Sequence, residues 1–124
     1  MTGKTVLIVE DNELNLKLFR DLLEAHSIHA LEVRDGTKAL DAAKEGMPDL
    51  ILLDIQLPHI SGFEIARQLK GTDKTRHIPI IAVTAFAMHE DEDKILAAGC
   101  EAYMAKPISI APFISTVRKF LKIV

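Results

Sequence analysis

The stretch Leu50-Ile51-Leu52-Leu53-Asp54 sets four large apolar residues in a row and ends on a carboxylate. Pro48 before the run and Pro58 after it leave too little length for a helix. An unbroken apolar run is typical of a strand buried on both faces of a parallel sheet. The run therefore predicts a central strand, with Asp54 at the carboxyl end, where open α/β sheets bind their ligands.

Length and composition bound the class of protein. A chain of 124 residues is large enough to bury a core, so we expect one domain over residues 1–124 and no separate output domain. Apolar residues make up 48% and charged residues 27%, which is typical of a globular chain. The formal charge is −3 and basic residues form no block, so we expect no binding to nucleic acid.

The sequence gives no sign of export or of a membrane anchor. The apolar run at Val6–Val9 is too short for the core of a signal peptide, and no stretch approaches the roughly 18 apolar residues of a membrane span. Cys100 is the only cysteine, which excludes an intramolecular disulfide and favours a reducing compartment. We therefore expect a soluble, cytoplasmic protein that does not insert into membranes.

Short apolar runs alternate with helical patterns along the whole chain. The predicted strands are Val6–Val9, Ala30–Val33, Leu50–Asp54, Ile80–Val83 and Ala102–Ala105. The predicted helices follow Asn12 (apolar at Leu14, Leu18, Phe19, Leu22 and Leu23), Asp35-Gly36 (Ala39, Leu40, Ala43 and Met47 on one side) and Ser61-Gly62 (Phe63, Ile65, Ala66 and Leu69), then span Asp91–Ala98 and Ile110–Ile123. This alternation predicts a doubly wound (βα)5 three-layer α/β sandwich of the flavodoxin-like class, for which the parallel strand order 2-1-3-4-5 is common.

Three carboxylates follow the first and third predicted strands. In that strand order these strands are neighbours about 4.8 Å apart, so Asp11 and Asp54 meet at the carboxyl edge with Glu10 beside them. Crowded carboxylates repel one another, so the group should hold on to protons unless a cation is bound. Such an all-oxygen cluster is what Mg²⁺ uses beside a phosphate. A solvated acidic edge would explain each residue singly, but it fits poorly with all three together.

A hydroxyl and an ammonium follow the next two strands. Thr84 is one strand away from Asp54, and Lys106 is two strands away, roughly 10 Å by the same spacing. Only a long side chain crosses that gap, and its charge would neutralise an anion on Asp54. Taken alone, Thr84 could be a helix cap and Lys106 a surface lysine. Together with Asp54 and Mg²⁺ they make a phosphoryl-transfer site.

Four motifs carry these residues: Val9-Glu10-Asp11-Asn12, Leu53-Asp54-Ile55-Gln56-Leu57-Pro58 with Gly62, Val83-Thr84-Ala85, and Lys106-Pro107. In this order, and over the whole chain, they resemble the receiver domain of two-component response regulators. Longer stretches over residues 9–15 and 82–88 resemble single-domain receivers that regulate cell division. The resemblance thus implies a signalling protein in cell-cycle and division control.

The resemblance also implies roles for the phosphorylation site. Asp54 would accept a phosphoryl group from the phosphohistidine of a sensor histidine kinase or a histidine phosphotransfer protein. Asp11, Asp54 and the backbone carbonyl of Gln56 would bind Mg²⁺, for which Mn²⁺ would substitute, and Glu10 would act through metal-bound water. Lys106 would hold a phosphate oxygen and precede a cis peptide bond. The chain would catalyse its own phosphorylation and slow dephosphorylation without being a conventional enzyme.

Signal output is implied in the same way. Thr84 and Tyr103 would form a switch pair, in which the hydroxyl moves to the phosphate and the ring turns inward behind it. Gln56 and Phe86 occupy positions that tune the phosphate lifetime in this family. A downstream protein would bind the face made by the fourth helix, fifth strand and fifth helix.

Other protein classes fit the sequence less well. In a flavodoxin, Glu10-Asp11 would repel the FMN phosphate. An aspartate-nucleophile phosphatase needs a second carboxylate two residues after the nucleophile, where this chain has Gln56. The serious alternative is a phosphate-independent pseudo-receiver, an interaction module that would normally lack one of the four residues Asp11, Asp54, Thr84 or Lys106.

Overall fold

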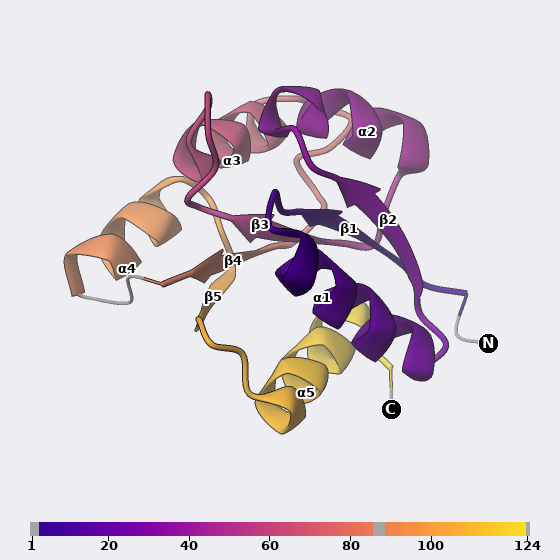
Figure 1. Cartoon of the computed structure of the whole chain (residues 1–124). Helices are drawn as coiled ribbons and strands as arrows, with labels where there is room; N and C mark the ends of the chain where they lie inside the picture. Colours follow the sequence, from indigo (N-terminus) through magenta and orange to yellow (C-terminus); the bar gives the residue numbers. More distant parts are fainter. Residues whose placement is uncertain (1–2, 86–88, 124) are drawn as a thin grey trace.

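The computed structural model describes residues 3–85 and 89–123, which form a parallel sheet between two layers of helices (Figure 1). The strands are β1 (Thr5–Val9), β2 (His29–Val33), β3 (Leu50–Asp54), β4 (Ile80–Thr84) and β5 (Ala102–Ala105). The helices are α1 (Glu13–Ala25), α2 (Ala39–Gly46), α3 (Gly62–Lys70), α4 (His89–Ala97) and α5 (Ile110–Leu121), with a 3-10 turn η1 (Gly36–Lys38) before α2. The strand order is β2-β1-β3-β4-β5 and the pairings are all parallel, which confirms the predicted fold class.

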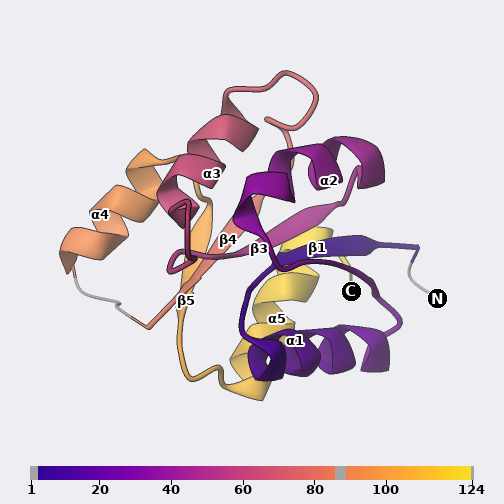
Figure 2. The same ribbon diagram turned by 45° about the horizontal axis from the view of Figure 1, so that its top comes forward.

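Each face of the sheet carries its own core. Helices α2, α3 and α4 cover one face, and α1 and α5 cover the other (Figures 1 and 2). Alternate residues of β3 enter the two cores: Ile51 and Leu53 face α2 and α3, whereas Leu50 and Leu52 face α1 and α5. All five residues of β3 are buried, as predicted for a central strand covered on both sides.

The register of the strands brings the polar strand ends to one edge. Val9 pairs with Leu53, and Asp54 pairs with Val83, so the residue after β1 and the last residue of β3 reach the same level. Thr84 pairs with Ala105, the last residue of β5, so Lys106 follows at the same edge, one residue beyond the level of Thr84. In the part of the chain that the structure describes, no helix is long and apolar enough to cross a membrane.

Two of the sequence predictions about helix faces were wrong. Helix α1 begins at the predicted Asn12 cap, whose side chain accepts a hydrogen bond from the Asn15 N–H (3.0 Å). Its buried residues are Leu16, Phe19 and Leu23, whereas Leu14 is 79% exposed. The second error is Met47, which lies beyond α2 in a left-handed conformation (φ 42°) with its side chain 42% exposed.

The ends of the last two helices also differ from the prediction. Helix α4 begins at His89, two residues before Asp91, and Gly99 after it has the expected left-handed backbone (φ 101°). Helix α5 ends at Leu121 because Lys122 turns left-handed (φ 58°), so Ile123 is outside the helix. The exposed Pro112 lies in the first turn of α5, where a missing N–H costs no helical hydrogen bond.

Candidate functional site

Glu10, Asp11 and Asp54 meet at the carboxyl edge of the sheet. One carboxylate oxygen from each residue lies within 4.8 Å of the other two. The side chains differ in exposure: Glu10 is 1% and Asp54 3% exposed, whereas Asp11 is open to solvent. The predicted acidic cluster therefore exists, with two members inside the protein and one at the surface.

Backbone hydrogen bonds hold the two buried acids in place. The Glu10 N–H donates to the Val33 carbonyl (3.0 Å), which anchors the end of β1 to β2. The Asn12 N–H donates to Glu10 Oε2 (3.2 Å), and the Gln56 N–H donates to Asp54 Oδ1 (2.9 Å). Each carboxylate is thus fixed by the turn that follows its own strand. No feature of the sequence indicated that the Val33 carbonyl would take part.

Lys106 reaches the acids from β5. Its Nζ lies 3.1 Å from Glu10 Oε1 and 3.3 Å from Asp54 Oδ2, so the long side chain spans the gap of two strands as predicted. Its N–H donates to the Thr84 carbonyl (2.8 Å), and the Lys106–Pro107 peptide bond is cis, which confirms that prediction. One ammonium therefore faces two buried carboxylates.

The imbalance of charge shifts the protonation of the site. Burial, the close contact with Asp54 and the charge of Asp54 raise the pKa of Glu10 to about 7, against a smaller lowering by Asn12 and Lys106. Burial alone would lower the pKa of Lys106, but its contact with Glu10 and the charges of Asp54 and Glu10 outweigh burial and raise it. Without a cation, the acids therefore hold a proton at near-neutral pH.

The site has the donor set of a hard divalent cation. Glu10 Oε1 is buried and, among the described residues, receives no hydrogen bond, because Lys106 approaches it as an ion pair without hydrogen-bond geometry. The three carboxylates around this oxygen carry more negative charge than the one ammonium beside it balances, so a further cation would be favourable. Oxygen ligands of this kind suit Mg²⁺. The residues present fit this ion.

The other predicted residues surround this centre to different degrees. Thr84 is buried (2% exposed) at the end of β4, and Tyr103 is half-buried on β5, opposite Ala82. The exposed Gln56 extends to the neighbouring loop, where its Oε1 accepts a hydrogen bond from the Ala85 N–H (3.4 Å). Phe86 lies outside the described residues.

Gly62 allows the chain to pass close behind Asp54. A Cβ at this position would lie 2.5 Å from Ile55 Cα and 2.7 Å from the Asp54 carbonyl oxygen, so no other residue fits without moving the backbone. Its N–H donates to the Ile55 carbonyl (3.0 Å), which closes the loop between β3 and α3. The sequence motif includes Gly62, but the spacing alone gave no reason for it.

Comparison with known proteins identifies the family. Residues 6–118 match the family described as the response regulator receiver domain. The chain belongs to this receiver family. It is 58% identical over 118 residues to the polar-differentiation response regulator DivK of Brucella anthropi, a match that covers 95% of this chain and 96% of that protein. The resemblance to receiver domains, and among them to a regulator of this kind, is therefore confirmed.

Two solved receiver structures show how close the fold is. The receiver domain of the sensor histidine kinase PA1611 from Pseudomonas aeruginosa, with a magnesium ion in its active-site cleft, has a TM-score of 0.89 and 32% identity, covering 97% of this chain and 98% of that one. The BeF3-activated N-terminal receiver domain of RstA from Klebsiella pneumoniae has a TM-score of 0.89 and 26% identity, covering 96% and 99%.

Proposed function

We propose that this receiver is a single-domain response regulator that accepts a phosphoryl group on Asp54 in a Mg²⁺-dependent reaction. The donor would be the phosphohistidine of a sensor histidine kinase or a histidine phosphotransfer protein. One observation carries the proposal: the buried Asp54 carboxylate, held by the Gln56 N–H, faces the Lys106 ammonium at 3.3 Å within an acidic cluster. A nucleophile, a countercharge and metal ligands thus converge on one point.

The metal ligands in this proposal are Asp11, Asp54 and the backbone carbonyl of Gln56, with Glu10 acting through water. Bound Mg²⁺ would neutralise charge on the phosphoryl oxygens, and Mn²⁺ would serve as well. The proton held by Glu10 would leave when the cation binds, because the cation then supplies the charge that the proton supplied. Binding of a cation would thus balance the two buried acids, which among the described residues have the single ammonium of Lys106 beside them.

The chain's own residues would divide the chemistry between them. An Asp54 carboxylate oxygen attacks phosphorus, the P–N bond of the donor breaks, and its electron pair returns to the imidazole. Lys106 binds a phosphoryl oxygen and balances the charge that forms there. The signal ends when water attacks phosphorus: the P–O bond to Asp54 breaks, its electron pair returns to the Asp54 carboxylate, and inorganic phosphate and a proton are released. Gln56 and Phe86 would set the rate of that step.

Signal output would pass through Thr84 and Tyr103 to a partner protein. Phosphorylation adds about two negative charges beside the buried Thr84 hydroxyl. If that hydroxyl moves toward the phosphate, the half-buried Tyr103 can turn into the space behind it. The face formed by α4, β5 and α5 would then change shape. Leu96 in α4 and Ile110 in α5 are 53% and 58% exposed. The name of the relative, a polar-differentiation response regulator, supports a role in cell-cycle and division control. We place this role in the cytoplasm.

The acceptor assignment is tested by labelling with acetyl phosphate. Asp54→Asn removes the nucleophile and should abolish labelling in the presence of Mg²⁺. Asp49→Asn is the matched control, because Asp49 precedes the same strand at its opposite end and binds the Thr5 N–H (2.9 Å). It should be labelled like the wild type. Equal labelling of all three proteins would contradict the assignment and favour a phosphate-independent interaction module.

The switch is tested by fluorescence. Tyr103 is the only tyrosine and the chain has no tryptophan, so tyrosine emission reports on this one side chain. Beryllofluoride with Mg²⁺ should change the emission of the wild type, because the ring moves. Thr84→Ala should reduce that change while leaving Asp54 open to labelling. If both proteins respond equally, Thr84 does not link the phosphate to Tyr103.

A further inference from the structure

The loop between β3 and α3, residues 55–61, packs against a glycine from another part of the chain. Gly36 begins η1 and is buried. A Cβ at this position would lie 2.9 Å from Ile60 Cγ2 and 3.1 Å from Leu57 Cδ1, both in the loop, and 2.7 Å from Ile65 Cδ1 in α3. A methyl group at position 36 would therefore force these side-chain ends in the loop and in α3 to shift.

Internal hydrogen bonds restrict the backbone of this loop. The Gly62 N–H closes it on the Ile55 carbonyl (3.0 Å), and the Ile60 N–H donates to the Pro58 carbonyl (2.8 Å). His59 between them has a left-handed backbone (φ 72°). The peptide bond between Gln56 and Leu57 carries the carbonyl that we propose as a metal ligand. Leu57 follows that carbonyl directly, so a push on the Leu57 side chain that also shifts its backbone would move the carbonyl.

The turn beneath the loop is fixed as firmly. The Asp35 side chain accepts hydrogen bonds from the Thr37 N–H (3.0 Å) and the Thr37 hydroxyl (2.7 Å), and these lower the pKa of Asp35. Ile65, on the α3 side, is completely buried in the core and has no open space to move into. A methyl group at position 36 would thus displace the half-buried Leu57 and Ile60, which are the partners with a free side.

We propose that Gly36 is a positioning residue for the metal site. Without a side chain at position 36, the β3–α3 loop can adopt the conformation in which the Gln56 carbonyl faces the cation. The inference rests on the proposed function, because it concerns the same cation. Gly36 contributes no ligand, and a Cβ there would have its nearest contacts with the loop and α3, not with a carboxylate. Its effect on the metal passes through Leu57 and Ile60.

The test compares two glycine variants at the two ends of the η1–α2 segment. Gly36→Ala should weaken binding of Mg²⁺ about 10-fold or more, the usual consequence of disturbing a group that orients a ligand. Gly46→Ala is the matched control, because its Cβ would also meet a side-chain end, Leu31 Cδ1 at 2.6 Å, but lies at the opposite end of α2 and has no contact with the β3–α3 loop. Titration calorimetry of the metal-free, folded proteins gives the affinities. Equal Mg²⁺ affinity in wild type, Gly36→Ala and Gly46→Ala would overturn the proposal.

A second variant covers the case in which Gly36→Ala does not fold. Leu57→Ala removes the contact from the loop side and leaves Gly36 in place, so Mg²⁺ affinity should fall several-fold; an unchanged affinity would count against the positioning role. Thermal melting in EDTA separates this loss from instability, since the affinity is measured only on folded protein. Absence of Mg²⁺ binding by the wild type would overturn the proposed function as well, whereas normal binding by the wild type and all variants overturns only the role of Gly36.

Discussion

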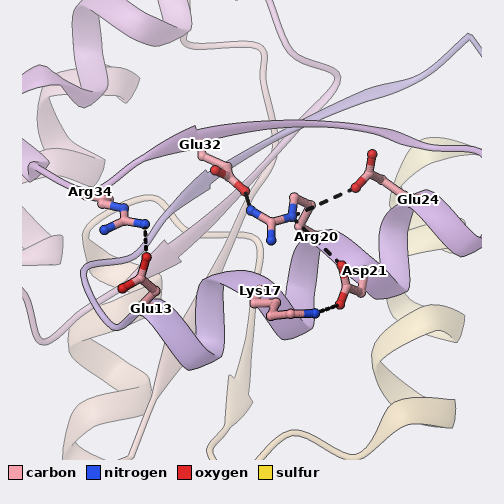
Figure 3. Close-up of polar contacts among 7 residues, drawn as sticks. All are labelled: Glu13, Lys17, Arg20, Asp21, Glu24, Glu32 and Arg34. Atoms are coloured by element: carbon pink, nitrogen blue, oxygen red, sulfur yellow. Dashed lines mark hydrogen bonds and ion pairs between the residues drawn. The ribbon is translucent and has the colours of Figure 1, made fainter.

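The charges at the carboxyl edge of the sheet and the charges between α1 and β2 use the same residue types in opposite surroundings. Figure 3 shows the second group, which comprises Glu13, Lys17, Arg20, Asp21, Glu24, Glu32 and Arg34. Lys17 and Asp21 lie 2.5 Å apart with side chains 63% and 53% exposed. In contrast, Glu10 and Asp54 are almost completely buried around Lys106.

The difference shows how burial turns an ion pair into a binding site. At the surface, water and salt screen each pair, and the basic partners lie beside the acids, so the group needs no further ion. At the sheet edge, one ammonium faces two buried carboxylates with a third nearby. Charge that is buried and unbalanced costs free energy, and this cost falls when a proton or a cation arrives. The pKa of Glu10 is raised because Glu10 is buried beside Asp54.

The largest expected effect is the pH dependence of stability caused by Glu10. Its pKa rises from 4.5 to about 7 on folding, so the folded chain binds this proton more tightly than the unfolded chain. The stabilisation is complete below about pH 4.5 and is lost as the pH rises to about 7, a change of about 3 kcal/mol in the free energy of unfolding. Glu10→Gln should remove this dependence, as measured by urea denaturation in EDTA at several pH values. An unchanged difference between pH 5 and pH 8 in the variant would show that Glu10 is not its source.

The next effect concerns the half-buried ammonium of Lys106. Lys106→Ala should slow labelling by acetyl phosphate about 100-fold, because one preorganised charge is lost from the site. The melting temperature without metal should move by only a few degrees, since protonation of Glu10 can offset the missing charge. A variant that fails to fold would instead identify Lys106 as a structural residue.

The smallest effect belongs to the surface group. Lys17→Ala removes a lysine of the same kind from an exposed pair and serves as the matched control for Lys106→Ala. It should change the melting temperature by about 3 °C or less and leave labelling unaffected. If Lys17→Ala lost as much labelling as Lys106→Ala, the surface charges would matter to phosphorylation as much as those at the sheet edge, which contradicts the comparison.

The fold was predictable because its strands are short, apolar and sharply bounded. Leu50–Asp54 identifies the central strand by its apolar run alone, and Asn12 marks the start of α1 by its capping chemistry. The face of α1 was not predictable, because leucines occur on several sides of this helix. The choice is made by packing against α5, where the Phe19 and Phe113 rings stack with centroids 5.4 Å apart. Such a contact depends on residues far apart in sequence.

The site was predictable in its residue types but not in its supports. Strand ends in a known order place Asp11, Asp54 and Lys106 together, and crowding of acids correctly indicates that the site holds a proton. The Val33 carbonyl and the contact of Gly36 with the loop have no local pattern, because they depend on how two turns meet in space. These supports are visible only in the folded chain.

We propose that the carboxylates at the sheet edge bind Mg²⁺ because their charge is buried and not fully balanced. Titration of the wild type and of Asp11→Ala with Mg²⁺ at pH 7.5 tests this claim. The wild type should bind Mg²⁺, and Asp11→Ala should bind it at least about 10-fold more weakly. The variant's stability in EDTA should be unchanged or higher, because removal of one acid relieves repulsion. Equal Mg²⁺ affinity in the two proteins would contradict the claim.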